Sequence, residues 1–64
     1  MTDGQKRLLI CGMVATLNSG LSVTSDDMRK AAEIVGGDTD TEVLHRVAEK
    51  AAEYGYHLTP RSVV

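Results

Sequence analysis

A chain of 64 residues with a net charge of −2, no Phe, no Trp and a single cysteine, Cys11, is long enough for one small domain. One cysteine excludes an internal disulfide, and no Cys/His cluster has zinc-ligand spacing. The seven lysines and arginines are scattered, which argues against an electrostatic surface for nucleic acid. We therefore expect a helical core without metal or cofactor, stabilised by a partner chain, in a soluble cytoplasmic protein.

The first predicted helix spans residues 3–18, and Asn18, Ser19 and Gly20 supply its stop signal. Its centre, residues 8–15, is apolar on nearly every side. Two further helices in one small chain cannot easily cover such a helix all round, so part of its surface is expected to meet a second molecule. We predict a homo-oligomer, most simply a dimer, that forms through five residues of this helix: Leu9, Ile10, Met13, Val14 and Leu17.

The same segment has two other notable features. Lys6 and Arg7 precede the apolar run, as in a short signal peptide. Cleavage after this run would leave roughly 45 residues with little core, which argues against a signal peptide. The run is also shorter than the ~20 apolar residues that span a bilayer, so we expect no membrane segment. Gly12 is expected to mark a close approach by another helix, although glycine costs up to ~1 kcal/mol of helix propensity at this point.

The second predicted helix spans residues 25–36. The Thr24 hydroxyl can accept the backbone N–H of Asp27 while the Asp27 carboxylate reaches back, and Gly36 can end the helix in the left-handed conformation. One face is apolar, and the other can carry the i,i+4 ion pairs Asp26–Lys30 and Arg29–Glu33. The apolar face consists of Met28, Ala31, Ala32 and Val35.

The third predicted helix spans residues 40–54, opens with a capping box of Thr39 and Glu42, and ends at Gly55. Its buried stripe is Val43, Val47, Ala51 and Tyr54, joined by Leu44 and Ala48. Residues 56–64 form a short tail, and residues 20–24 are either a loop that plugs the bundle or a short strand that needs a partner. The pattern predicts one all-α domain over residues 1–64, a three-helix bundle.

An acidic run beside the third helix has some spacing of a calcium-binding EF-hand loop. Asp38, Asp40 and Glu42 alternate, and Glu49 follows. The match fails at Val43, which stands where the sharp turn requires Gly. We therefore interpret these acids as helix-capping residues that complement the positive end of the helix dipole.

No residue has a recognisable catalytic arrangement. His45 and His57 lack a second ligand at metal spacing, and Cys11 lies within an apolar run where a thiol normally serves packing. We therefore expect a protein that is not an enzyme. The last three residues, Ser62, Val63 and Val64, have the pattern of a PDZ-domain ligand, which short sequences often share by chance.

Four short segments occur in the following order: "ATL" (15–17), "VTSDDM" (23–28), "IVGG" (34–37) and "DTD" (38–40). Across residues 7–50 this order resembles the N-terminal dimerisation domain of the acidic ribosomal stalk proteins of eukaryotes and archaea. The resemblance implies a four-helix domain that pairs through its first helices and anchors a stalk that binds translation factors. Its fourth helix would have to come from residues 57–64. The 64 residues contain neither the Ala-rich hinge nor the acidic tail of that family.

Two alternatives stay open. "LSVT", a helix and a second helix after Gly36 also resemble a ribbon-helix-helix DNA-binding regulator. In that case Ser22 and Thr24 would read bases, and Thr39 at a helix N-terminus would hold phosphate. The strand lacks Arg, Lys, Asn and Gln, the usual base readers, so nucleic acid is not the expected partner. The other alternative is a small phage or regulatory protein that binds a host protein.

Overall fold

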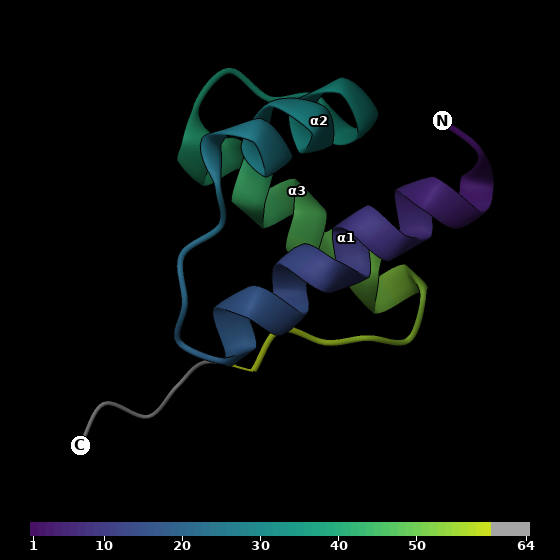
Figure 1. Cartoon of the computed structure of the whole chain (residues 1–64), viewed down its shortest axis with the longest axis vertical. Coiled ribbons are helices and arrows are strands. Elements are labelled where there is room, and N and C mark those ends of the chain that lie inside the picture. The colour runs from purple at the N-terminus through teal and green to yellow at the C-terminus, as the bar shows by residue number, and fades with distance from the viewer. Residues whose placement is uncertain (60–64) are drawn as a thin grey trace.

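The computed structural model describes residues 1–59, which form three α-helices: α1 (Asp3–Asn18), α2 (Ser25–Val35) and α3 (Asp40–Glu53) (Figure 1). These bounds agree with the predicted helices to within one residue, and the all-helical, three-helix architecture is confirmed. Residues 1–59 contain no strand, so residues 20–24 are a loop. Residues 56–59 are not helical, and the rest of the segment considered for a fourth helix lies outside the described residues.

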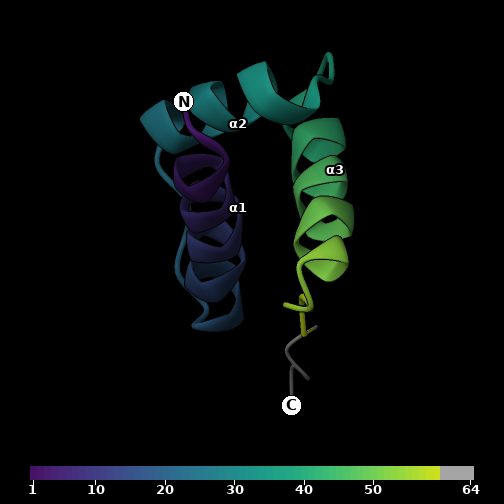
Figure 2. The ribbon, with the colours of Figure 1, turned by 90° about the vertical axis from the view of Figure 1, so that its right-hand side faces the viewer.

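The helices α1 and α3 pack face to face and cross each other (Figure 1), and α2 lies across one end of this pair (Figure 2). In Figure 2, α1 and α3 both run downward, and α2 crosses their upper ends. All three pairs of helices are in contact. The chain after α3 then turns back toward the C-terminal end of α1 (Figure 1).

A threonine caps the N-terminus of each helix. The hydroxyls of Thr24 and Thr39 accept the backbone N–H groups of Asp27 (3.1 Å) and Glu42 (3.2 Å), as the sequence predicts. The reciprocal half of the capping box expected at Thr39 is replaced, because the Glu42 carboxylate accepts from Arg46 (2.9 Å). A complete box forms instead before α1, at Thr2. Its hydroxyl accepts from the backbone N–H of Gln5 (3.2 Å), whose side chain accepts from the Thr2 N–H (2.9 Å).

The end of α2 differs from the expected left-handed cap. Gly36 has φ +76° and ψ −173°, a positive φ with extended ψ that is essentially reserved for glycine. Gly37 follows with φ +122°. On the inside of this turn, Nη1 of Arg46 donates to the carbonyl of Val35 at 3.0 Å. The two glycines and this arginine together reverse the chain from α2 into α3.

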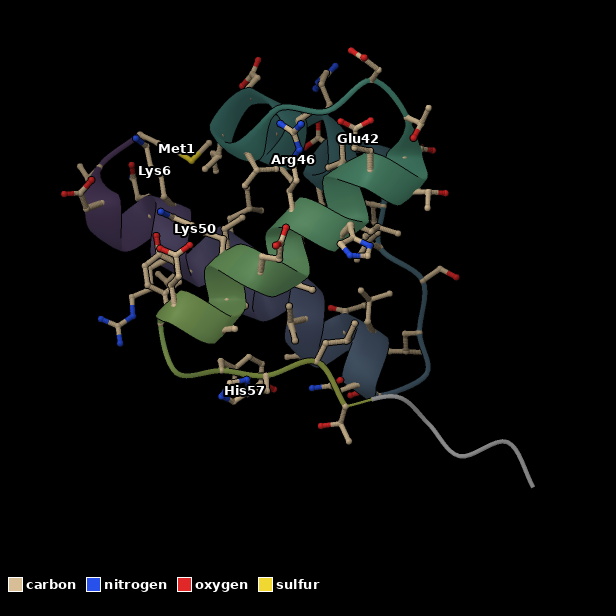
Figure 3. The ribbon with its side chains drawn as sticks, turned by 180° about the vertical axis from the view of Figure 1, so that it is seen from behind. Met1, Lys6, Glu42, Arg46, Lys50 and His57 are labelled. Carbon is tan, nitrogen blue, oxygen red and sulfur yellow. The ribbon has the colours of Figure 1, made fainter. Side chains whose placement is uncertain are left out.

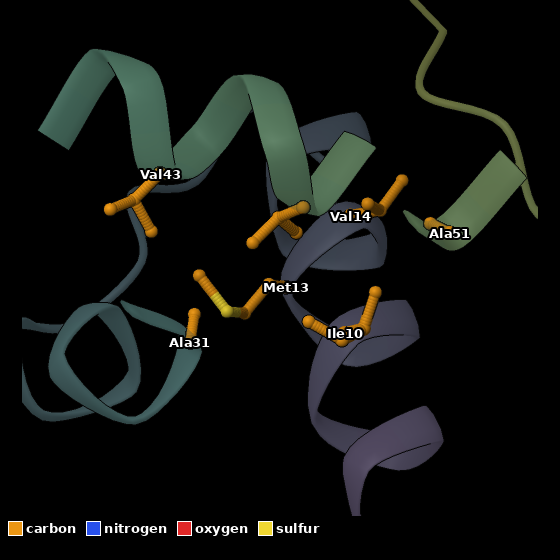
Figure 4. Close-up of a cluster of buried hydrophobic side chains, with 7 residues drawn as sticks. Ile10, Met13, Val14, Ala31, Val43 and Ala51 are labelled. Atoms are coloured by element: carbon orange, nitrogen blue, oxygen red, sulfur yellow. The ribbon is translucent and has the colours of Figure 1, made fainter. Parts of the chain in front are cut away.

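The core is small and purely aliphatic (Figure 4). Met28, Ala32, Leu44 and Tyr54 flank it and are partly buried, as the predicted apolar faces of α2 and α3 require. No polar side chain is buried within residues 1–59. Seven residues are fully buried: Ile10, Met13, Val14, Ala31, Val43, Val47 and Ala51.

Candidate interaction surface

The predicted self-association residues divide between the core and its edge. Ile10, Met13 and Val14 are 0%, 2% and 0% exposed, packed within the chain's own core. Leu9 and Leu17 are partly buried. A contact between copies through the three buried residues would require the core to open. These three residues lie on the side of α1 that α2 and α3 cover, so a contact between copies that keeps the core intact would have to use other residues of α1.

The opposite side of α1 is only partly covered by the rest of residues 1–59. Leu8 is 76% exposed and Gly12 is exposed, whereas Cys11 and Ala15 are partly buried, as Leu9 and Leu17 are. A Cβ built on Gly12 would meet nothing within 4 Å, so the close helix approach predicted for Gly12 does not occur within the chain. We call Leu8, Cys11, Gly12 and Ala15 the outer face of α1. Positions 8, 11, 12 and 15 recur at helical spacing, but positions 10, 13, 14 and 17 do so too, so the spacing alone does not identify the outer face.

The turn after α3 raises one side of the outer face into a groove. A hollow of about 470 Å³ lies between α1 and the turn, with Tyr54, Gly55 and Tyr56 as its other wall. The Arg7 guanidinium lies 5.5 Å from the centroid of the Tyr54 ring, and the Lys50 ammonium lies 5.8 Å from it. The contact of Arg7 with Tyr54 links the first half of α1 to the end of α3, whereas Lys50 lies one turn before Tyr54 within α3 itself.

A second groove of about 610 Å³ runs between α3 and the segment after it. Asn18 holds the segment that supplies His57 and Leu58 to this groove, because its side chain bonds the backbone of His57 and Thr59. His57 and His45 line the same groove, although they are far apart in sequence; Figure 3 shows His57 below α3. Its apolar lining is Leu17, Leu44, Ala48, Ala52 and Leu58.

The acidic run and the histidines do not form a metal centre in the part of the chain described. No group of three or more His, Cys, Asp or Glu side chains among residues 1–59 could hold an ion. Asp40 and Glu42 lie in the first turn of α3, where their charges complement the helix dipole, but the Glu42 carboxylate pairs with Arg46 instead of capping the helix. Likewise, none of the described helices is long and apolar enough to cross a membrane.

The DNA-reading candidates lie at the starts of α2 and α3. Thr24 and Thr39 use their hydroxyls as helix caps, and Ser22 is exposed in the loop before α2. A shallow hollow of about 280 Å³ places Thr39 near Ser25, so the two helix starts are neighbours. Their first turns carry four acidic residues, which oppose a phosphate there: Asp26, Asp27, Asp40 and Glu42.

No protein-family model matches the chain, and no curated protein or solved structure is significantly similar to it. The ribosomal-stalk resemblance therefore stays a prediction from the sequence segments alone.

Proposed function

We propose that this chain is a non-enzymatic protein–protein interaction module that associates with a second copy of itself through the outer face of α1. The observation that carries the proposal is the exposure of Leu8, at 76%, on the same face as Gly12 and Ala15. A large apolar side chain next to small residues gives one face both a projection and a hollow. A twofold contact needs such a self-complementary patch, because each copy contributes the same surface.

The size of the face indicates the strength of the contact. An isolated exposed leucine is ordinary on a protein surface. Burying Leu8 in each of two copies would contribute roughly 1.5–3 kcal/mol per copy before the cost of association. The contact is confined to one 16-residue helix and its flanking groove, so we expect a small interface and a dimer that depends on concentration. In the reducing cytoplasm that we propose as its location, Cys11 would remain a thiol.

Sedimentation or light scattering across a wide range of concentrations tests the proposal. We expect Leu8→Glu to abolish association while the circular dichroism spectrum stays helical, because Leu8 is outside the core. Leu21→Glu is the matched control, since Leu21 is 65% exposed but lies on the loop after α1. Met13→Glu should instead unfold the chain by burying a charge. A chain that stays monomeric at every concentration, or equal losses in the Leu8 and Leu21 variants, would contradict the proposal.

The alternative functions differ in the molecule that the module would bind besides its second copy. The ribosomal-stalk prediction and the host-protein alternative both require a second protein, so we propose affinity capture from the native host with the associating chain and the Leu8→Glu variant in parallel. The DNA-binding alternative makes a different prediction, a steep loss of duplex affinity with rising salt. No duplex binding at low salt would remove that alternative.

A further inference from the structure

We infer that the two copies pair with their α1 helices antiparallel, with the twofold axis passing between Cys11 and Gly12. This inference rests on the proposed function, because it specifies how the second copy lies on the outer face of α1. It follows from the order of large and small residues along that face and from the charges at the two ends of the helix.

The outer face is large at one end and small at the other. Leu8 and Ala15 are equally distant from the midpoint between Cys11 and Gly12, so an antiparallel pair sets Leu8 of each copy over Ala15 of the other. Ala15 forms part of the groove beside Tyr56, and that groove can receive the leucine. The helix axes then keep one separation along the contact, because each large residue meets a small one.

A parallel pair would instead set Leu8 against Leu8 and Ala15 against Ala15. The separation that two leucines require is larger than the separation that two alanines require. The helices would therefore diverge at the leucine end or leave a gap at the alanine end. Gly12, which has open space above it, would have no projecting residue to fill that space.

The charges favour the same direction. Arg7 borders the outer face in the first half of α1. The last turn of α1 has no basic residue, and backbone N–H groups of residues 19–21 bond the carbonyls of residues 15–17 there. An antiparallel pair places Arg7 of each copy beside the last turn of the other, where a cation is favourable. Asp3, the acidic residue of the first turn, is five residues before Leu8 and so faces away from the contact at about 100° per residue.

Disulfide trapping tests the direction of the pair. In the antiparallel pair, Cys11 lies within one residue of the twofold axis. The two copies of residue 15 would instead be about 10.5 Å apart along the direction of the helices. That offset exceeds the ~4.4–6.8 Å between Cα atoms that a disulfide allows. Diamide is the oxidant, because it takes one hydrogen from each of two thiols as the S–S bond forms. The two samples are the unaltered chain, which contains Cys11, and the double variant Cys11→Ser/Ala15→Cys, which keeps Leu8.

We expect a cross-linked dimer from Cys11 and its loss in the Ala15→Cys variant, with maleimide labelling to show that both thiols are reachable. Cross-linking at both positions that Leu8→Glu abolishes would establish a parallel pair, in which residues 11 and residues 15 each face their own copies, and would overturn this inference. The proposed function would survive that result if sedimentation still showed a dimer that Leu8→Glu abolishes. Equal cross-linking at both positions that Leu8→Glu leaves unchanged would indicate random collision and overturn the inference. A chain that sediments as a monomer throughout would overturn both.

Discussion

The side-chain amide of Asn18 at the end of α1 holds the backbone of Thr59, 41 residues later: the Thr59 N–H donates to Asn18 Oδ1 at 2.8 Å. The same amide donates from Nδ2 to the carbonyl of His57 at 3.2 Å. One side chain thus pairs with an extended segment as a neighbouring strand would. This pairing places Leu58 at the edge of the 610 Å³ groove beside α3.

Replacing Asn18 by alanine should release this segment while the helices stay folded. We expect a loss of about 1 kcal/mol in the free energy of unfolding, because both hydrogen bonds are exposed. Hydrogen exchange of the Thr59 amide, followed by NMR, measures the release directly. Asn18→Asp is the informative partner variant: it keeps the acceptor for Thr59 and loses the donor to His57. Equal exchange of Thr59 in the native chain and Asn18→Ala would show that the amide does not hold the segment.

Arg46→Lys should destabilise the turn between α2 and α3. The guanidinium bonds the Val35 carbonyl through Nη1 (3.0 Å) and Glu42 through Nη2 (2.9 Å). A single ammonium cannot keep both bonds in this geometry. We expect the free energy of unfolding, measured by urea denaturation, to fall by about 1 kcal/mol. Arg29→Lys is the control, because Arg29 pairs with Asp26 of its own helix on the surface, and the loss in this variant should stay within about 0.5 kcal/mol.

Gly37→Ala should be among the most damaging single-methyl changes in this chain. Gly37 has φ +122°, and an added Cβ would lie 3.0 Å from Cγ2 and 3.2 Å from the backbone nitrogen of Val43. We expect a cost of about 2 kcal/mol or more from backbone strain and this contact. Gly12→Ala is the opposite case, since its Cβ meets nothing within 4 Å and alanine favours the helix by up to ~1 kcal/mol. Thermal unfolding at low concentration, where the chain is monomeric, compares the two; a tolerated Gly37→Ala would contradict the turn geometry.

Asp26 should make α2 sensitive to acid. The hydrogen bond and charge of Lys30, with the neighbouring Arg29, hold the pKa of Asp26 below that of an ordinary aspartate. A lowered folded-state pKa gives stability that is complete above the unfolded value of about 3.9 and is lost as the pH falls through the lower folded value. Asp26→Asn should therefore be less stable than the native chain near neutral pH, with the difference vanishing in strong acid. Because Asp26 and its partners are exposed, high salt should also reduce the stability difference between Asp26→Asn and the native chain. A stability difference that depends on neither pH nor salt would contradict the pairing of Asp26 with Lys30.

The local sequence fixes where the helices begin and end. Thr24 and Thr39 accept the N–H groups of the residues three positions on, and Gly55 follows the end of α3, because these interactions involve residues that are neighbours in the chain. The apolar spacing of Val43, Val47 and Ala51 likewise predicts their burial, since the other face of α3 is polar. The complete capping box at Thr2 and Gln5 was also present in the sequence and was missed.

The tertiary structure alone decides which side of α1 is left partly uncovered. Leu8, Ile10, Met13 and Val14 are all apolar, so no contrast along the sequence separates the outward residue from the three that are buried. The side that faces inward depends on where α2 and α3 lie, and Asn18 finds its partner Thr59 only once α3 has brought the chain back. Periodicity identifies a buried face only when the opposite face is polar, and the middle of α1 has no polar face.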